Sequence, residues 1–89
     1  MTENIKIVKF GEIASSLGTR NLASKLREEV LLEIEERDKI VCDFTGVNVV
    51  TNSFANEYFG KLINIISAEK FKEKFALNRK VYYKPHLLI

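Results

Sequence analysis

The fold is decided by residues 40–62, which read IVCDFTGVNVVTNSFANEYFGKL. The first part, Ile40–Thr45, is rich in β-forming residues and is bounded by Gly46, so it predicts a buried strand. Residues 47–53 form a short, partly apolar connection. From Phe54 to Ser67, apolar residues follow helical spacing so densely that we expect a helix buried on more than one side. This stretch is therefore a strand that leads through a short loop into a helix.

The start of this helix carries residues suited to its amino end. Asn52 or Ser53 is expected to cap it, because short polar side chains accept hydrogen bonds from first-turn N–H groups. Glu57 follows in the first turn, where a negative charge suits the helix dipole. Phe54 and Phe59 are expected in the core.

Two further strands and one more helix follow from the flanking sequence. Ile5–Phe10 alternates in polarity, which suits a strand with at least one buried face. Thr19 is a suitable N-cap for a helix over Arg20–Arg37. The apolar stripe of that helix consists of Leu22, Leu26, Val30 and Ile34, with Ala23 and Leu31 beside it. Phe75–Asn78 predicts another strand.

The expected order of elements is β, α, β, α, β, which favours a mixed or parallel sheet. Right-handed crossovers put both helices on one face, so the other face needs cover or tolerates solvent. We therefore expect an α/β fold in which a small mixed sheet carries two main helices packed on one face. The 89 residues suffice for one domain, 1–89, with a core of about 5–78 and a C-terminal arm or strand over 79–89.

Composition and cysteine content indicate a globular domain in a reducing compartment. The longest apolar stretches are only a few residues long, too short to span a bilayer, and no signal peptide is visible. Cys42 is the only cysteine, so we expect neither a disulfide nor a cysteine-built metal site. Within its strand we expect it to be a small apolar filler. The expected location is the cytoplasm.

The sequence offers no recognisable set of catalytic residues. It has no nucleophile–base pair, no glycine-rich phosphate loop and no metal-ligand cluster, and its single histidine, His86, lies near the chain end. Asp43 and Glu57 are the only carboxylates near the strand–helix junction. We therefore expect a protein that is not an enzyme and needs no cofactor or metal.

The C-terminal quarter of the chain is basic. Residues 67–89 carry six lysine or arginine residues against two glutamates, within a formal net charge of +2 for the whole chain. A solvated lysine-rich surface is the more common explanation of such a segment. The alternative is an accessory protein that binds nucleic acid through this segment, with Tyr82 and Tyr83 stacking on bases.

The strand–loop–helix stretch also carries a resemblance to a known family. Residues 41–47 (VCDFTGV) and 50–62 (VTNSFANEYFGKL) resemble the central motif of the STAS-like family of unknown function. Gly18-Thr19-Arg20, ahead of the first helix, matches the same pattern. That family looks like a divergent branch of STAS domains of the anti-sigma-factor-antagonist type. The resemblance implies a STAS-like fold and a regulatory, non-enzymatic module that binds a protein such as a histidine-kinase-like ATPase.

The resemblance also identifies where this chain departs from typical STAS domains. There the junction reads Asp-Ser-Ser/Thr-Gly, and a partner kinase phosphorylates the first hydroxyl residue. Aligned without gaps, Thr51 takes the place of the Asp and Asn52 that of the phosphorylated residue, while Ser53 takes the second hydroxyl position and Phe54 the Gly. Because Asn52 cannot accept a phosphate, the switch is either absent or moved to Ser53 or Thr51.

The helix start is the best candidate for a functional surface on physical grounds as well. Unpaired N–H groups at the positive end of a helix dipole hold a phosphate or a partner's carboxylate. The candidate partner-binding residues are Thr51, Asn52, Ser53, Asn56 and Glu57, the last two as exposed recognition residues, with Thr19, Arg20 and Asp43 as possible accessories. The alternative is that Thr51, Asn52 and Ser53 are only turn and cap residues. A homodimer through the end after Asn78 is also open.

Overall fold

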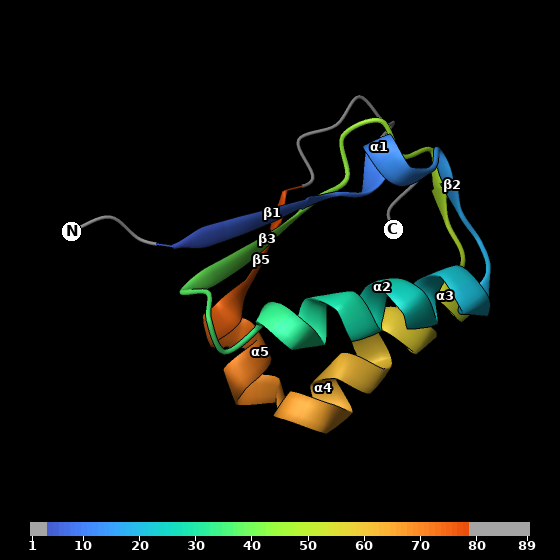
Figure 1. The fold of residues 1–89 in the computed structure, drawn as a ribbon. Helices are drawn as coiled ribbons and strands as arrows, with labels where there is room; N and C mark the ends of the chain where they lie inside the picture. The colour runs from blue at the N-terminus through green and yellow to red at the C-terminus, as the bar shows by residue number, and fades with distance from the viewer. Residues whose placement is uncertain (1–3, 79–89) are drawn as a thin grey trace.

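The three expected strands form one small parallel sheet in the computed structural model, which describes residues 4–78 (Figure 1). Strands β1 (Ile5–Lys9), β3 (Lys39–Asp43) and β5 (Phe75–Asn78) lie in the order β1-β3-β5. Both strand pairs are parallel, with Val8 opposite Cys42 and Cys42 opposite Leu77. The α/β fold is confirmed, and of the mixed and parallel arrangements the parallel one is present. The expected arm or strand over 79–89 lies outside the described residues.

All the long helical segments lie on one face of this sheet (Figure 1). Helix α2 (Arg20–Glu33) connects β1 to β3. The connection from β3 to β5 contains α3 (Asn52–Ala55), the π-helical η1 (Asn56–Gly60) and α4 (Lys61–Ile66), which follow one another without a break, and then α5 (Ala68–Lys74). The two main helices are thus confirmed on one face, and α5 is an additional helix between the second of them and β5.

Two short strands that the sequence did not predict tie the loops together. Strand β2 (Ser16–Leu17) follows the short helix α1 (Phe10–Ile13), and strand β4 (Val49–Val50) precedes α3. They pair in parallel as a separate two-stranded sheet. Asn48 N–H donates to the Ser15 carbonyl at 2.8 Å, which extends this pairing by one hydrogen bond. The segment between Gly11 and Gly18 and the expected connection at 47–53 are therefore joined into one unit.

The core lies between the sheet and the helices and is rich in aromatic rings. Phe10, Phe54 and Tyr58 are fully buried, and the Phe10 ring meets Tyr58 edge-on at a centroid distance of 5.4 Å. Phe54 is confirmed as a core residue, and Phe59 packs against the core while partly exposed. Cys42 is fully buried, and burial raises the pKa of its thiol to about 12. Its role as an apolar filler is confirmed.

The other face of the sheet is not covered by any helix among residues 4–78 (Figure 1). Ile5 and Ile7 are about half exposed on this face, and Ala76 is exposed.

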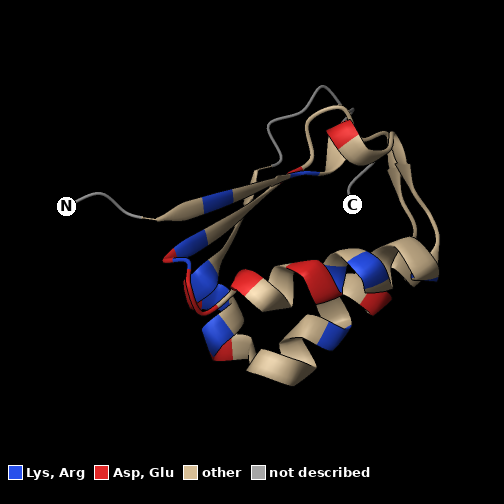
Figure 2. Cartoon of the chain, viewed as in Figure 1, with Lys and Arg blue, Asp and Glu red and all other residues tan. Residues whose placement is uncertain are grey.

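Charged residues of both signs alternate over the helices (Figure 2). Among the described residues, no helix has the length and apolar composition needed to cross a membrane.

Candidate functional site at the amino ends of α2 and α3

Helices α2 and α3 begin side by side because the β2–β4 pair leads into both of them (Figure 1). Each helix starts with a threonine cap. The Thr19 hydroxyl oxygen accepts from Leu22 N–H at 3.2 Å, as expected, and the Thr51 hydroxyl oxygen accepts from Phe54 N–H at 3.1 Å. The expectation that Asn52 or Ser53 caps the second helix is therefore wrong. The helix begins at Asn52, two residues before the predicted start at Phe54, so Thr51 occupies the N-cap position.

Thr51 also joins the two helix starts. Its N–H donates to the Leu17 carbonyl at 3.0 Å, and its hydroxyl lies 3.2 Å from the Gly18 carbonyl, to which it donates. The same hydroxyl therefore accepts from one helix and donates to the loop that precedes the other. Thr51 is a structural residue of the site, and its hydroxyl is already engaged on both sides.

The outer surface of this junction is formed by small polar residues. Asn52 and Asn56 are exposed, and Ser53 is half-buried. Thr19 and Arg20 lie beside them on the neighbouring helix start, both exposed. The amino ends of α2 and of the α3–η1–α4 segment point toward the same end of the molecule (Figure 1), so their positive dipole ends add there.

Glu57 does not lie on that outer surface. Its exposed fraction is 8%, and its carboxylate is surrounded by cations from two helices. Arg27 Nη1 donates to Glu57 Oε2 at 2.9 Å and to the Glu57 backbone carbonyl at 2.6 Å. The Lys61 ammonium lies 3.2 Å from the Glu57 carboxylate, and the Arg20 guanidinium lies 3.8 Å from it. The expectation of an exposed recognition residue is wrong, because Arg27 draws this side chain inward.

These contacts decide the protonation of Glu57. The Arg27 guanidinium, followed by the Lys61 ammonium, holds the pKa of the Glu57 carboxyl below its ordinary value. The carboxylate is thus ionised at neutral pH, and three cations share its single negative charge. The surroundings of Glu57 therefore carry excess positive charge, on Arg20 of α2 and Lys61 of α4, whose side chains are more than half exposed.

Asp43 belongs to a different part of the structure. Its Oδ1 accepts from the Thr45 N–H at 2.9 Å and lies 3.4 Å from the Asn78 side-chain amide. The hydrogen bonds to Thr45 lower the pKa of the Asp43 carboxyl. Asp43 thus stabilises the turn at the carboxyl end of β3, and the structure gives it no contact with the 51–57 segment.

The sequence interpretation missed Arg27 and Lys61. Arg27 lies on α2 between Leu26 and Val30, on the side of the helix that carries the apolar stripe, and only 12% of its side chain is exposed. A cation within an apolar stripe indicates a buried acidic partner, so this signal was present in the sequence.

In the described part of the chain no group of three or more His, Cys, Asp or Glu residues is placed to hold a metal ion.

The fold and this junction define an α/β domain in which a parallel strand leads through a short loop into a capped helix. The chain belongs to the family described as STAS-like domain of unknown function (DUF4325), whose sequence model matches residues 23–78. That span runs from α2 to the end of β5 and includes the whole 51–57 segment. No match was found among the curated proteins or among the solved structures.

The cap at Thr51 gives a first testable prediction. Thr51→Val keeps the shape of the side chain but removes the acceptor for Phe54 N–H and the donor to Gly18, so it is expected to lower the free energy of unfolding by about 1–2 kcal/mol. Thr51→Ser keeps the hydroxyl and should retain most of that stability. Urea denaturation followed by circular dichroism measures both. Equal stability of Thr51→Val and the wild type would show that the cap contributes nothing.

The environment of Glu57 predicts a pH dependence. Because the folded-state pKa of Glu57 is lowered, its contribution to stability is present above the ordinary glutamate pKa and is lost as the pH falls through the lower folded value. Glu57→Gln should therefore be less stable than the wild type at neutral pH, and the two should converge as the solution is acidified. Glu28→Gln, an exposed change on α2, should match the wild type at neutral pH. A constant difference between Glu57→Gln and the wild type at every pH would contradict the ion-pair explanation.

Proposed function

We propose that this STAS-like domain is a non-enzymatic binding module whose protein partner docks on the amino ends of α2 and α3. The observation that carries the proposal is the joining of two helix starts by Thr51, which brings two positive dipole ends and the Arg20 side chain to one surface. Asn52 and Asn56 are exposed there and are the recognition residues. Glu57 is buried beneath this surface, and its carboxylate positions Arg20 and Lys61 through ion pairs.

The chemistry of this surface favours an acidic group on the partner. N–H groups of the first helical turn have no partner within the helix, and they point toward solvent at the positive dipole end. Arg20 and Lys61 add cationic side chains that Glu57 only partly neutralises. A carboxylate of the partner, placed over Asn52 and Ser53, would be held by these donors without any covalent change.

A phosphate on Ser53 would use the same donors and so would compete with that carboxylate. Asn52 has no hydroxyl, and the Thr51 hydroxyl already makes two hydrogen bonds. Ser53 is therefore the residue of this loop that we propose as the modification site. By analogy with anti-sigma-factor antagonists, the partner is a histidine-kinase-like ATPase of the cytoplasm, and phosphorylation releases it.

Affinity capture with paired variants tests this proposal. The tagged domain, its Asn56→Glu variant and its Asn64→Glu variant are incubated with native extract, and bound proteins are quantified by mass spectrometry. Asn56 and Asn64 are both exposed and lie on the same helical segment, but only Asn56 belongs to the proposed surface. We expect a histidine-kinase-like ATPase that is retained by the wild type and by Asn64→Glu and is lost from Asn56→Glu, because the new carboxylate repels the acidic group of the partner. Equal retention by all three would overturn the proposal.

A further inference from the structure

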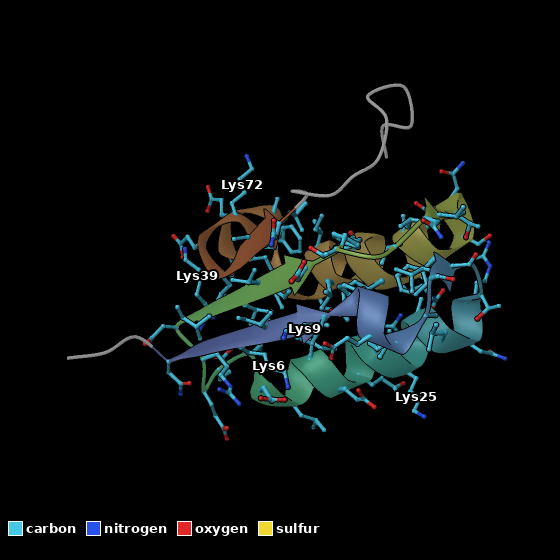
Figure 3. All side chains as sticks on the ribbon, turned by 90° about the horizontal axis from the view of Figure 1, so that it is seen from above. Lys6, Lys9, Lys25, Lys39 and Lys72 are labelled. Atoms are coloured by element: carbon cyan, nitrogen blue, oxygen red, sulfur yellow. The ribbon has the colours of Figure 1, made fainter. Side chains whose placement is uncertain are left out.

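Strand β1 forms one edge of the three-stranded sheet, and helix α2 runs along this edge on the covered face of the sheet (Figure 1). Among residues 4–78 it pairs only with β3, so its other edge presents backbone N–H and C=O groups without a strand partner. Seen from the open face of the sheet, the order across the molecule is β5, β3, β1 and then α2, which runs along the free edge of β1 at a lower level (Figure 3). Helix α2 therefore lies beneath the position that a fourth strand would occupy (Figures 1 and 3).

A groove of about 410 Å³ lies at this position. The apolar side chains that line it come from β1, α1 and α2 and include Val8, Ile13, Leu26 and Val30. Charged side chains form its rim, namely Lys6, Lys9, Glu12, Glu29 and Glu33. The groove thus combines an apolar floor, a charged rim and a free strand edge. At such a site, hydrogen bonds to the backbone of an added strand supply affinity, and the pockets for its alternate side chains supply specificity.

The charges at the rim favour one kind of occupant. Lysines on an edge strand usually oppose strand pairing. Here Lys6 lies 3.2 Å from the Glu33 carboxylate and Lys9 lies 3.9 Å from that of Glu12, so both lysines have acidic neighbours within the domain. Glu29, by contrast, makes no ion pair with a lysine or arginine in the described part of the chain, although it is exposed and lines the groove. An incoming strand that directs a basic side chain toward α2 would meet this unpaired carboxylate.

We propose that the free edge of β1 takes up an extended peptide segment of a partner protein as a fourth strand. Side chains that point toward α2 enter the groove, with a basic one beside Glu29 and an apolar one over Val8 and Leu26. The alternate side chains, apolar and β-branched, continue the row of Ile5 and Ile7 on the open face. This site is separate from the surface at 51–57 and does not depend on it.

A peptide is a better occupant than a second copy of this chain. A second copy that added through its own β1 would bring its own α2 beneath the new pair of strands, where the first α2 already lies (Figure 3). An extended segment that carries no covering helix meets no such obstacle.

Two labelled peptides test the proposal by fluorescence anisotropy with the full chain. The first is acetyl-Thr-Val-Lys-Val-Val-Val-Thr, and in the second the lysine is replaced by glutamate. We expect the lysine peptide to bind more tightly than the glutamate peptide by about tenfold. Glu29→Lys should reverse this preference. Glu28→Lys, an adjacent change outside the groove, should leave it unchanged.

The position of the bound peptide is checked by amide chemical shifts, which should change over Ile5–Lys9. Absence of binding at millimolar peptide would overturn the proposal, as would equal affinity for the two peptides or equal effects of Glu28→Lys and Glu29→Lys. A free protein that sediments as a dimer with protected β1 amides would overturn it as well, since a second copy would then hold the edge.

Discussion

Replacing Gly11 with alanine is expected to lower the free energy of unfolding by about 3 kcal/mol. A Cβ atom at this position would lie 1.9 Å from the Thr45 carbonyl oxygen and 3.0 Å from the carbonyl carbon, both backbone atoms. Thr45 cannot withdraw easily, because its N–H is bound to Asp43 and the next residue, Gly46, already has a φ of 89°. The clash would separate α1 from the turn that leads to β4 and the site.

Gly60→Ala is the matched control for this change. A Cβ atom at Gly60 would have Asn56 Oδ1 as its nearest neighbour, at 4.0 Å, and the residue lies inside a continuous helical segment. Alanine there is expected to be neutral or stabilising by up to about 1 kcal/mol. Thermal or urea unfolding compares the two variants. A Gly11→Ala protein as stable as Gly60→Ala would show that α1 does not approach the Thr45–Gly46 turn as described.

Phe54→Ala is expected to lower the free energy of unfolding by about 4 kcal/mol. Phe54 is fully buried at the start of α3, where its ring stacks on Tyr58 at a centroid distance of 5.9 Å and meets Phe10 edge-on at 6.2 Å. Its removal leaves a cavity beneath the site. The backbone N–H of residue 54 still donates to Thr51 in the variant, but the ring no longer holds this residue in the core, so we expect the amino end of α3 to become mobile.

Two other variants define the scale of the Phe54 effect. Phe54→Leu keeps most of the apolar volume and should cost about 1.5 kcal/mol or less. Leu32→Ala removes an apolar side chain that is 81% exposed on α2, so its effect should stay within about 0.5 kcal/mol. Urea unfolding ranks the three proteins. A Phe54→Ala protein no less stable than Leu32→Ala would contradict the packing of α3 on the aromatic core.

The main strands and helices could be predicted because their apolar patterns are strong and local. The alternation of Ile5–Phe10, the β-rich run Ile40–Thr45 and the four-residue spacing on α2 each specify one element and the face that it buries. The burial of Cys42 and Phe54 followed from the same patterns. The single covered face of the sheet followed from the handedness of the crossovers.

The details of the site could not be predicted because they depend on contacts between distant segments. Strands β2 and β4 have two residues each, too few for any periodic pattern, and they exist because Ser16–Leu17 meets Val49–Val50. Glu57 was expected in the first turn of a helix starting at Phe54, where a side chain is exposed, and the approach of Arg27 from α2 explains its burial. The position of the cap at Thr51, ahead of the predicted Asn52 or Ser53, likewise follows from the hydrogen bond of Thr51 to Gly18.

The most direct test is a chemical-shift map of the isotopically labelled domain, recorded with and without its captured partner. If the partner docks on the joined helix starts, the perturbed amides will cluster at Thr19–Arg20 and over residues 51–56, while those of α5 stay in place. A map in which the 51–56 amides do not move on saturation, and the changes gather on α5 or on the carboxyl end of α2, would contradict the proposed docking surface.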